Sequence, residues 1–295
     1  MRGCPASPPT LHATPTLELV VVPSPFLGAY LEHRDFLSGT LGESSLLIAR
    51  TYLSTSYLTT AAQLAQKAYA IETGPAVQAG RIGLVERDDH HACASAAIIM
   101  SALGVEAFVN ELFADCQATD ARNLFGLSDS HARKLAHVWG KGRPKGRRRR
   151  RTQQTHDFQF KRSLDKYAKV LTELDLPRLD FKAEPVKAMD TLISLRNALA
   201  HYKLAIQTVG GQSEQRALTA PEKELQQYFP DHDQPRRNPM TGVSNAYILD
   251  RVIGHAVAEW SVQTAVAFLE HFRELLSVTP HRGHRWPTQV MLLTR

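Results

Sequence analysis

The chain has few cysteines. Only Cys4, Cys93 and Cys116 occur in 295 residues. Their odd number and wide spacing argue against a disulfide framework, and no two of them stand at the spacing of zinc ligands. We therefore expect a reduced, cytoplasmic protein that uses no metal and no cofactor.

Long hydrophobic runs are also scarce. The apolar stretch nearest the start, residues 17–30, is interrupted by Pro23 and Pro25, and little positive charge precedes it. It is therefore a poor signal peptide, and no other segment has the pattern of a membrane span. We expect no association with a membrane.

Alternating strand patterns are few, and no internal repeat occurs. Apolar residues instead recur at steps of three and four, which is typical of amphipathic helices. The sequence thus predicts an all-α fold, a helical bundle of about five long helices. Helical patterns cover residues 43–72, 88–116, 130–138, 160–174, 186–205 and 245–276.

Helix signals and turn residues divide the chain. Asp88 or Asp89 is expected to cap the second helix, and Pro185 suits the first turn of the helix that it precedes. The proline-rich segment 209–244 is expected to be a long loop. We predict an irregular lead-in over 1–43, one helical domain over 44–278, and a mobile basic tail over 279–295.

Acidic residues are nearly missing from one part of the chain. Residues 133–162 hold 12 of the 35 basic residues and a single acid, Asp157. The remaining 23 basic and 28 acidic residues have a net charge of −5, although the whole chain has +6. Such asymmetry suggests a partner that carries phosphates.

The centre of this basic segment is expected to be an exposed loop over residues 140–151, because like charges, glycines and Pro144 cannot pack together. Its arginines are candidates for binding a nucleic-acid backbone. Without interleaved aromatic residues, sequence-specific reading is not expected. A solvated loop or a contact for an acidic partner protein remains an alternative. The arginines are Arg147, Arg148, Arg149, Arg150 and Arg151.

An arginine and a histidine stand near the end of the helix predicted over 186–205. Arg196 precedes His201 by five positions, a spacing that 24 arginines and 13 histidines produce about once by chance. On a helix Asn197 and His201 share a face, and the long side chain of Arg196 reaches toward it. A guanidinium beside an apolar helix face needs an acid or a phosphate as its partner.

The helix predicted over 88–116 offers such an acid. Glu106 and Asn110 are four residues apart and interrupt its apolar run. Two helices that each carry a polar pair at helical spacing suggest one shared polar site. Glu106 is expected to orient Arg196 or His201, and Asn110 to add a hydrogen bond; both could instead be helix-packing contacts.

The segment Leu195-Arg196-Asn197-Ala198-Leu199-Ala200-His201-Tyr202-Lys203 resembles the signature of HEPN domains. Residues 95–114 and the segment Ala258-Glu259-Trp260-Ser261 are similar to other helices of bacterial members. The resemblance covers roughly residues 44–278. It implies an all-α bundle that dimerises, and in many members a metal-independent endoribonuclease of toxin–antitoxin or antiviral defence systems.

The resemblance also implies residue roles. His201 would be the general acid or base, Arg196 would hold the phosphate oxygens, and Asn197 would orient one of them. One histidine cannot easily serve as both acid and base, so a homodimer with two copies across one cleft is expected. Some toxin members carry a modifiable tyrosine two residues after the histidine; here Lys203 has that position.

Two other interpretations remain open. In the first, a non-catalytic HEPN-type module binds RNA or a partner protein, such as an antitoxin, and Arg196 forms only a structural ion pair. In the second, a DNA-binding regulator uses the arginines of loop 140–151. Loss of RNA cleavage on substitution of His201 would distinguish the nuclease from the non-catalytic module. Steeply salt-dependent binding of duplex DNA would be expected of the DNA-binding regulator.

Overall fold

The computed structural model describes residues 52–117, 125–140, 161–201, 220–229, 238–241, 247–279 and 294. Within these residues every regular element is a helix, so the all-α prediction is confirmed. The helices are α1 (Ser54–Glu72), α2 (Pro75–Gln78), α3 (Leu84–Gln117), α4 (Asp129–Gly140), α5 (Ser163–Glu173), α6 (Val186–Ala200), α7 (Ala220–Tyr228), α8 (Ile248–Val252) and α9 (His255–Leu276). The predicted lead-in over 1–43 and the loop over 140–151 fall outside the described residues, except for Gly140.

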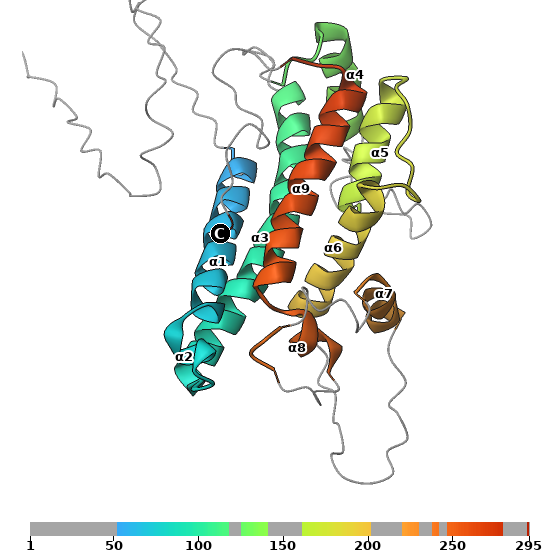
Figure 1. The fold of residues 1–295 in the computed structure, drawn as a ribbon. Helices are drawn as coiled ribbons and strands as arrows, with labels where there is room; N and C mark the ends of the chain where they lie inside the picture. Colours follow the sequence, from blue (N-terminus) through green and yellow to red (C-terminus); the bar gives the residue numbers. More distant parts are fainter. Residues whose placement is uncertain are drawn as a thin grey trace, which may run out of the picture. The chain divides into compact units, whose positions relative to one another are not determined.

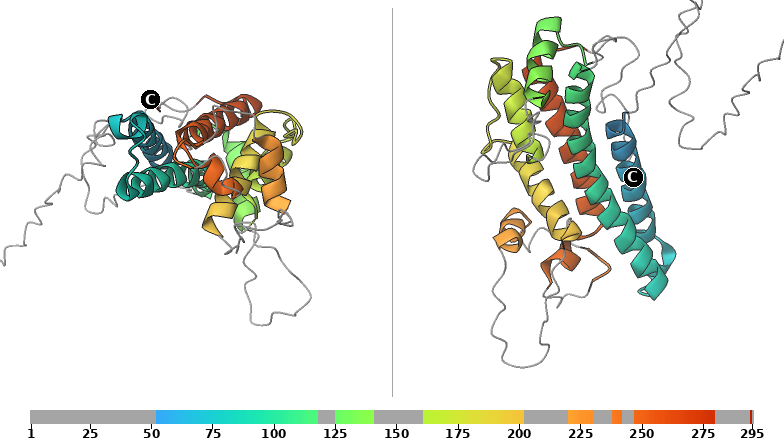
Figure 2. Two further views of the ribbon diagram at one scale, coloured as in Figure 1. Left: turned by 60° about the horizontal axis from the view of Figure 1, so that its bottom comes forward. Right: turned by 180° about the vertical axis from the view of Figure 1, so that it is seen from behind.

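Helix α3 is the centre of the bundle. It contacts α1, α4, α5, α6 and α9, and α9 also packs against α1 and α6. Figures 1 and 2 show α1 on one side of the α3–α9 pair, with α5 and α6 on the other. The bundle therefore brings residues of α3, α5 and α6 together, although they are far apart in the sequence.

Small residues let α1 and α3 approach closely. The buried face of α1 is rich in alanine, and Gly104 of α3 lies opposite Leu58. A Cβ atom at Gly104 would be 2.8 Å from Cγ of Leu58, which is too close for a larger residue unless the Leu58 side chain or the helices shift. Glycine is required here by the close helix contact.

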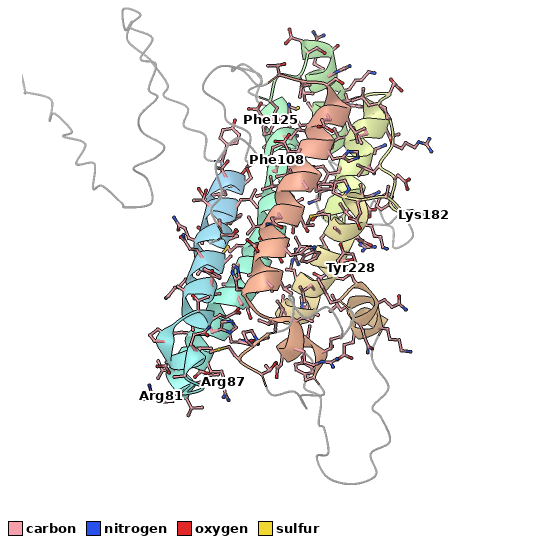
Figure 3. The ribbon with its side chains drawn as sticks, in the orientation of Figure 1. Arg81, Arg87, Phe108, Phe125, Lys182 and Tyr228 are labelled. Atoms are coloured by element: carbon pink, nitrogen blue, oxygen red, sulfur yellow. The ribbon has the colours of Figure 1, made fainter. Side chains whose placement is uncertain are left out.

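The aromatic core joins three helices and the connection between α3 and α4. The ring of Phe108 lies 5.2 Å from that of Phe125 and 6.5 Å from those of Tyr167 and Phe272. All four side chains are fully buried, and Figure 3 shows Phe108 and Phe125 beside each other. These contacts fix α5 and α9 against the middle of α3.

Several predicted boundaries were wrong. Helix α3 begins at Leu84, so Asp88 and Asp89 lie within it and do not cap it. In this first turn Leu84 and Val85 are 76% and 71% exposed, so they do not belong to the buried face that the periodic apolar pattern follows. Residues 209–244 are not all loop: α7 lies there, and Tyr228 and Phe229 pack on Trp260.

The last predicted helix is two helices. The chain turns at Ile253 and Gly254, where α8 ends and α9 begins. Glu72, the last residue of α1, accepts the backbone N–H of His255 at 2.7 Å, and its negative charge stabilises the amino end of α9. A side chain at Gly254 would stand 3.1 Å from this carboxylate, so glycine allows the approach.

The basic tail was expected to be mobile after Pro280. Thr294 contradicts this at one position, because its buried side chain donates a hydrogen bond to the Glu259 carboxylate at 2.7 Å. A carboxylate buried on α9 needs such a donor.

Helix α3 is long and apolar enough to cross a membrane by length and composition, and 56% of its most apolar window is buried within the protein. The central helix of a protein core has the same composition. The expected lack of membrane association stays a prediction.

The amino end of α1 is capped from α3. Glu111 accepts hydrogen bonds from the backbone N–H of Leu53 (2.5 Å), and from the N–H and the hydroxyl of Ser54 (2.8 and 2.6 Å). We predict that Glu111→Ala lowers the free energy of unfolding by about 2 kcal/mol, because three donors lose a charged acceptor.

Urea unfolding followed by circular dichroism measures this loss. Glu173→Ala is the matched control, because Glu173 forms a half-exposed ion pair with Lys169 within α5. Such a pair contributes about 0.5 kcal/mol or less. Equal losses in the two variants would show that Glu111 does not cap α1.

Candidate functional site

Helix α6 holds the predicted site against the core. Its buried face includes Met189, Leu192 and Leu195, which belong to the main apolar cluster. Arg196 follows immediately, on the edge of this face, and its side chain is 21% exposed. The guanidinium is therefore partly withdrawn from water, while α6 itself is firmly packed.

Among the described residues, two form hydrogen bonds with the Arg196 guanidinium. Its Nη2 donates to Oε2 of Glu106 at 2.7 Å, which forms an ion pair between α6 and α3. Its Nη1 donates to Oδ1 of Asn197 at 2.9 Å. The predicted contact between Glu106 and Arg196 is thus confirmed, and charge-assisted hydrogen bonds of this length are strong.

One nitrogen of Arg196 has no such partner. The Nε atom is buried and has no hydrogen-bond partner among the described residues. A buried N–H without an acceptor costs free energy, so an acceptor such as a phosphate oxygen would stabilise it.

His201 differs from its prediction. Helix α6 ends at Ala200, and His201 follows it with φ −115° and ψ 43° instead of lying inside a helix that continues to 205. Its backbone N–H still bonds to the carbonyl of Asn197 at 2.9 Å, which fixes its position at the end of the last turn.

The His201 side chain is exposed. The described hydrogen bonds do not join its imidazole to Arg196 or to Glu106. The structure therefore brings together Arg196, Asn197 and Glu106, and places His201 at the adjoining helix end with its ring open to solvent.

Asn110 has a different partner from the predicted one. Its Oδ1 accepts a hydrogen bond from Nζ of Lys166 at 2.9 Å. No described hydrogen bond joins Asn110 to Arg196 or His201. Lys166 lies on α5 and is only 1% exposed. Burial lowers the pKa of Lys166 below its ordinary value, and the nearby Glu106 carboxylate partly opposes that shift.

Sequence reasoning missed Lys166, although a signal was present. Tyr167, Val170 and Leu174 follow a helical apolar spacing, and Lys166, four residues before Val170, falls on the same face. Tyr167 beside it donates to the Val105 carbonyl at 2.6 Å, and burial raises its pKa well above the ordinary value. A lysine on a core face needs polar partners, which α3 supplies.

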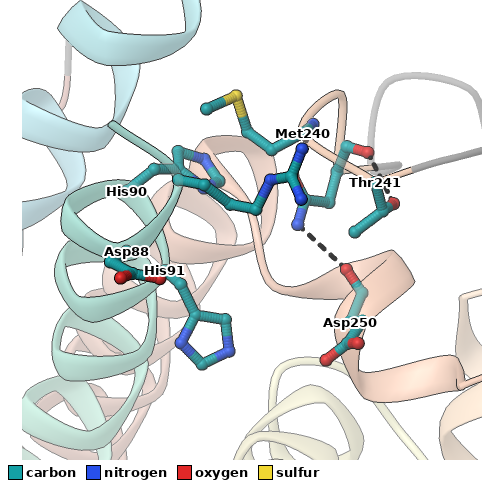
Figure 4. A pocket seen from close by; sticks show the side chains of 8 residues that line it. Asp88, His90, His91, Met240, Thr241 and Asp250 are labelled. Carbon is teal, nitrogen blue, oxygen red and sulfur yellow. Dashed lines mark hydrogen bonds between the residues drawn. The ribbon is translucent and has the colours of Figure 1, made fainter. Parts of the chain in front are cut away.

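A separate hollow lies near the amino end of α3. It has a volume of about 160 Å³, and His90, Met240 and Asp250 are among the residues that line it (Figure 4). His90 precedes Glu106 by 16 residues of α3, or about 24 Å along the helix. This hollow is therefore distinct from the Arg196 site.

Other predicted features concern metals and the basic loop. Within the described residues, no group of three or more His, Cys, Asp and Glu side chains is arranged to hold a metal ion. Arg147, Arg148, Arg149, Arg150 and Arg151 fall outside the described residues.

Comparisons with protein-family models, with curated proteins and with solved structures found no match to this chain. The contacts of Arg196, Glu106, Asn197 and Lys166 are therefore the physical basis for any functional assignment.

Proposed function

We propose that this protein is a metal-independent endoribonuclease of HEPN type that acts as a homodimer. The observation that carries the proposal is the Arg196 guanidinium, which Glu106 and Asn197 hold at the last turn of α6, directly before the exposed His201. The segment over residues 195–203 resembles the HEPN signature, and that resemblance gives roles to Arg196, Asn197 and His201.

The chemistry needs no metal. The 2′-hydroxyl of RNA attacks the adjacent phosphorus, and the 5′-oxygen of the next nucleotide leaves with a proton. His201 removes the proton of the 2′-hydroxyl as a general base, or supplies the proton of the leaving 5′-oxygen as a general acid. Arg196 stabilises the negative charge that develops on the non-bridging oxygens. The product carries a 2′,3′-cyclic phosphate.

A dimer supplies the second proton-transfer group. In one protomer His201 acts as the base, and His201 of a second copy acts as the acid across a shared cleft. The arginines at 147–151 would add affinity for the RNA backbone. A role in bacterial defence, with an antitoxin as partner and action in the cytoplasm, is part of the same proposal.

A second candidate has a specific observation in its favour. Glu106 already occupies Nη2 of Arg196, as a structural ion pair would. In this alternative the helical domain binds RNA or a partner protein without cleaving it, and Arg196 only joins α6 to α3.

The test is cleavage of RNA in the presence of a chelator. We expect the purified protein to produce fragments with cyclic phosphate ends, and His201→Ala to lower the rate at least about 100-fold, the usual size of a general acid–base contribution. His137→Ala is the matched control, because His137 is an exposed histidine in the last turn of α4.

Two results would contradict the nuclease. Undiminished cleavage by His201→Ala would exclude a role for this residue. RNA binding without cleavage by the wild-type protein would favour the non-catalytic module.

A further inference from the structure

The Arg196 site contains its own competitor for phosphate. Oε2 of Glu106 lies 2.7 Å from Nη2 of Arg196, where a phosphate oxygen would bind to the same edge of the guanidinium. A carboxylate and a phosphate at one guanidinium edge repel each other. RNA therefore binds fully only after Glu106 has moved away from Arg196.

Moving Glu106 has a cost that depends on its next partner. Its side chain is 32% exposed, so a displaced carboxylate remains partly withdrawn from water. A partly buried charge that loses its partner destabilises the protein. A second cation near Glu106 would remove most of that cost.

Lys166 is such a cation. Its Nζ atom contacts Asn110, which stands one helical turn after Glu106 on the same face of α3. Side chains at this spacing have Cβ atoms about 6 Å apart. The Glu106 carboxylate already acts on the pKa of Lys166, so the two groups lie near each other, and the exchange consists of rotations of these two side chains.

We propose that Lys166 is a positioning residue, which forms an ion pair with the Glu106 carboxylate when Arg196 binds a phosphodiester of RNA. The inference rests on the proposed function, because it assigns the ligand of Arg196. In the free protein Glu106 pairs with Arg196, and in the complex it pairs with Lys166. Glu106 and Arg196 each keep an oppositely charged partner in both states, while Lys166 changes its partner from the Asn110 amide to a carboxylate.

This exchange predicts a particular dependence between two residues. Without the lysine charge, Glu106 has no second partner and continues to compete with phosphate. Without the Glu106 charge, there is nothing to transfer, and Lys166 has no effect on binding. A lysine that only packs, or that touches the phosphate directly, weakens binding in both backgrounds.

A double-mutant cycle measures this dependence. The probe is a short RNA with 2′-O-methyl groups at every ribose, which removes the nucleophile and leaves only binding, followed by fluorescence anisotropy. We expect Lys166→Met to weaken binding about tenfold when Glu106 is present, and less than about twofold in the Glu106→Gln background. Glu106→Gln alone is expected to bind several-fold more tightly.

Controls separate the exchange from loss of structure. Lys169→Met, at a half-exposed lysine of the same helix, is expected to change binding less than about twofold. Each variant is melted to confirm cooperative unfolding. If Lys166→Met does not melt cooperatively, Lys166→Gln completes the same cycle, because its amide still donates to Asn110 but has no charge.

The outcomes are distinct. Equal weakening in both Glu106 backgrounds, or none in either, overturns the exchange while Arg196-dependent binding stands. If Arg196→Ala binds the probe as tightly as the wild type does, the proposed RNA site itself is wrong, and the exchange with it. Tenfold weakening in the wild-type background alone supports Lys166 as the alternative partner of Glu106.

Discussion

Arg196→Ala is expected to reduce the rate of RNA cleavage about 100- to 1000-fold. Asn197 and the packing of α6 position the guanidinium before substrate binds, and only the contact with Glu106 has to be exchanged for the phosphate. Loss of one such preorganised donor in a partly dry site has an effect of this size. Arg196→Lys is expected to recover little of the rate, because an ammonium cannot form two parallel hydrogen bonds.

Single-turnover cleavage at saturating protein measures the effect on the chemical step. The matched control is Arg178→Ala, an exposed arginine in the connection between α5 and α6. If Arg196 is only a structural ion pair, Arg196→Ala lowers the melting temperature but leaves the rate per folded molecule unchanged. That combination would show that Arg196 has no part in the cleavage step.

Local sequence patterns were sufficient to predict much of the helical bundle. The periodic apolar residues of α3, α4 and α5 predicted these helices to within about four residues at each end. The contact between Glu106 and Arg196 was also predictable, because each polar residue interrupts an apolar helix face and one supplies the charge that the other needs.

Other features depend on residues that are remote in the sequence. Glu111 caps α1 from a position 57 residues beyond Ser54, and Glu72 caps α9 from a position 183 residues before His255. Neither helix carries a capping side chain at its own amino end. Local capping rules cannot identify such ends, since the acceptor arrives only when the helices pack.

The partner of Asn110 was missed for a related reason. Asn110 was expected to serve Arg196 or His201, but α5 brings Lys166 to it. The pattern of α5 shows that Lys166 faces the core, yet it does not show which polar group lies opposite. That depends on the register between α3 and α5, which the aromatic contacts of Phe108 and Tyr167 fix.

Phe108→Ala is expected to produce the largest loss of stability. The ring is fully buried and contacts Phe125, Tyr167 and Phe272, which belong to three other parts of the bundle. Removing a buried phenyl ring loses its transfer free energy and leaves a cavity, which together cost about 3–5 kcal/mol. Chemical unfolding followed by circular dichroism measures this, with Phe181→Ala as control, because Phe181 is 48% exposed.

The same variant also separates stability from activity. Phe108 and Glu106 are two residues apart on α3, so their side chains point about 200° apart around the helix, one into the aromatic core and the other to Arg196. Well below its melting temperature, Phe108→Ala should therefore cleave RNA at nearly the wild-type rate per folded molecule. A large loss of cleavage in the folded variant would mean that the aromatic core itself positions Glu106, and that the site is less independent of the bundle interior than its contacts indicate.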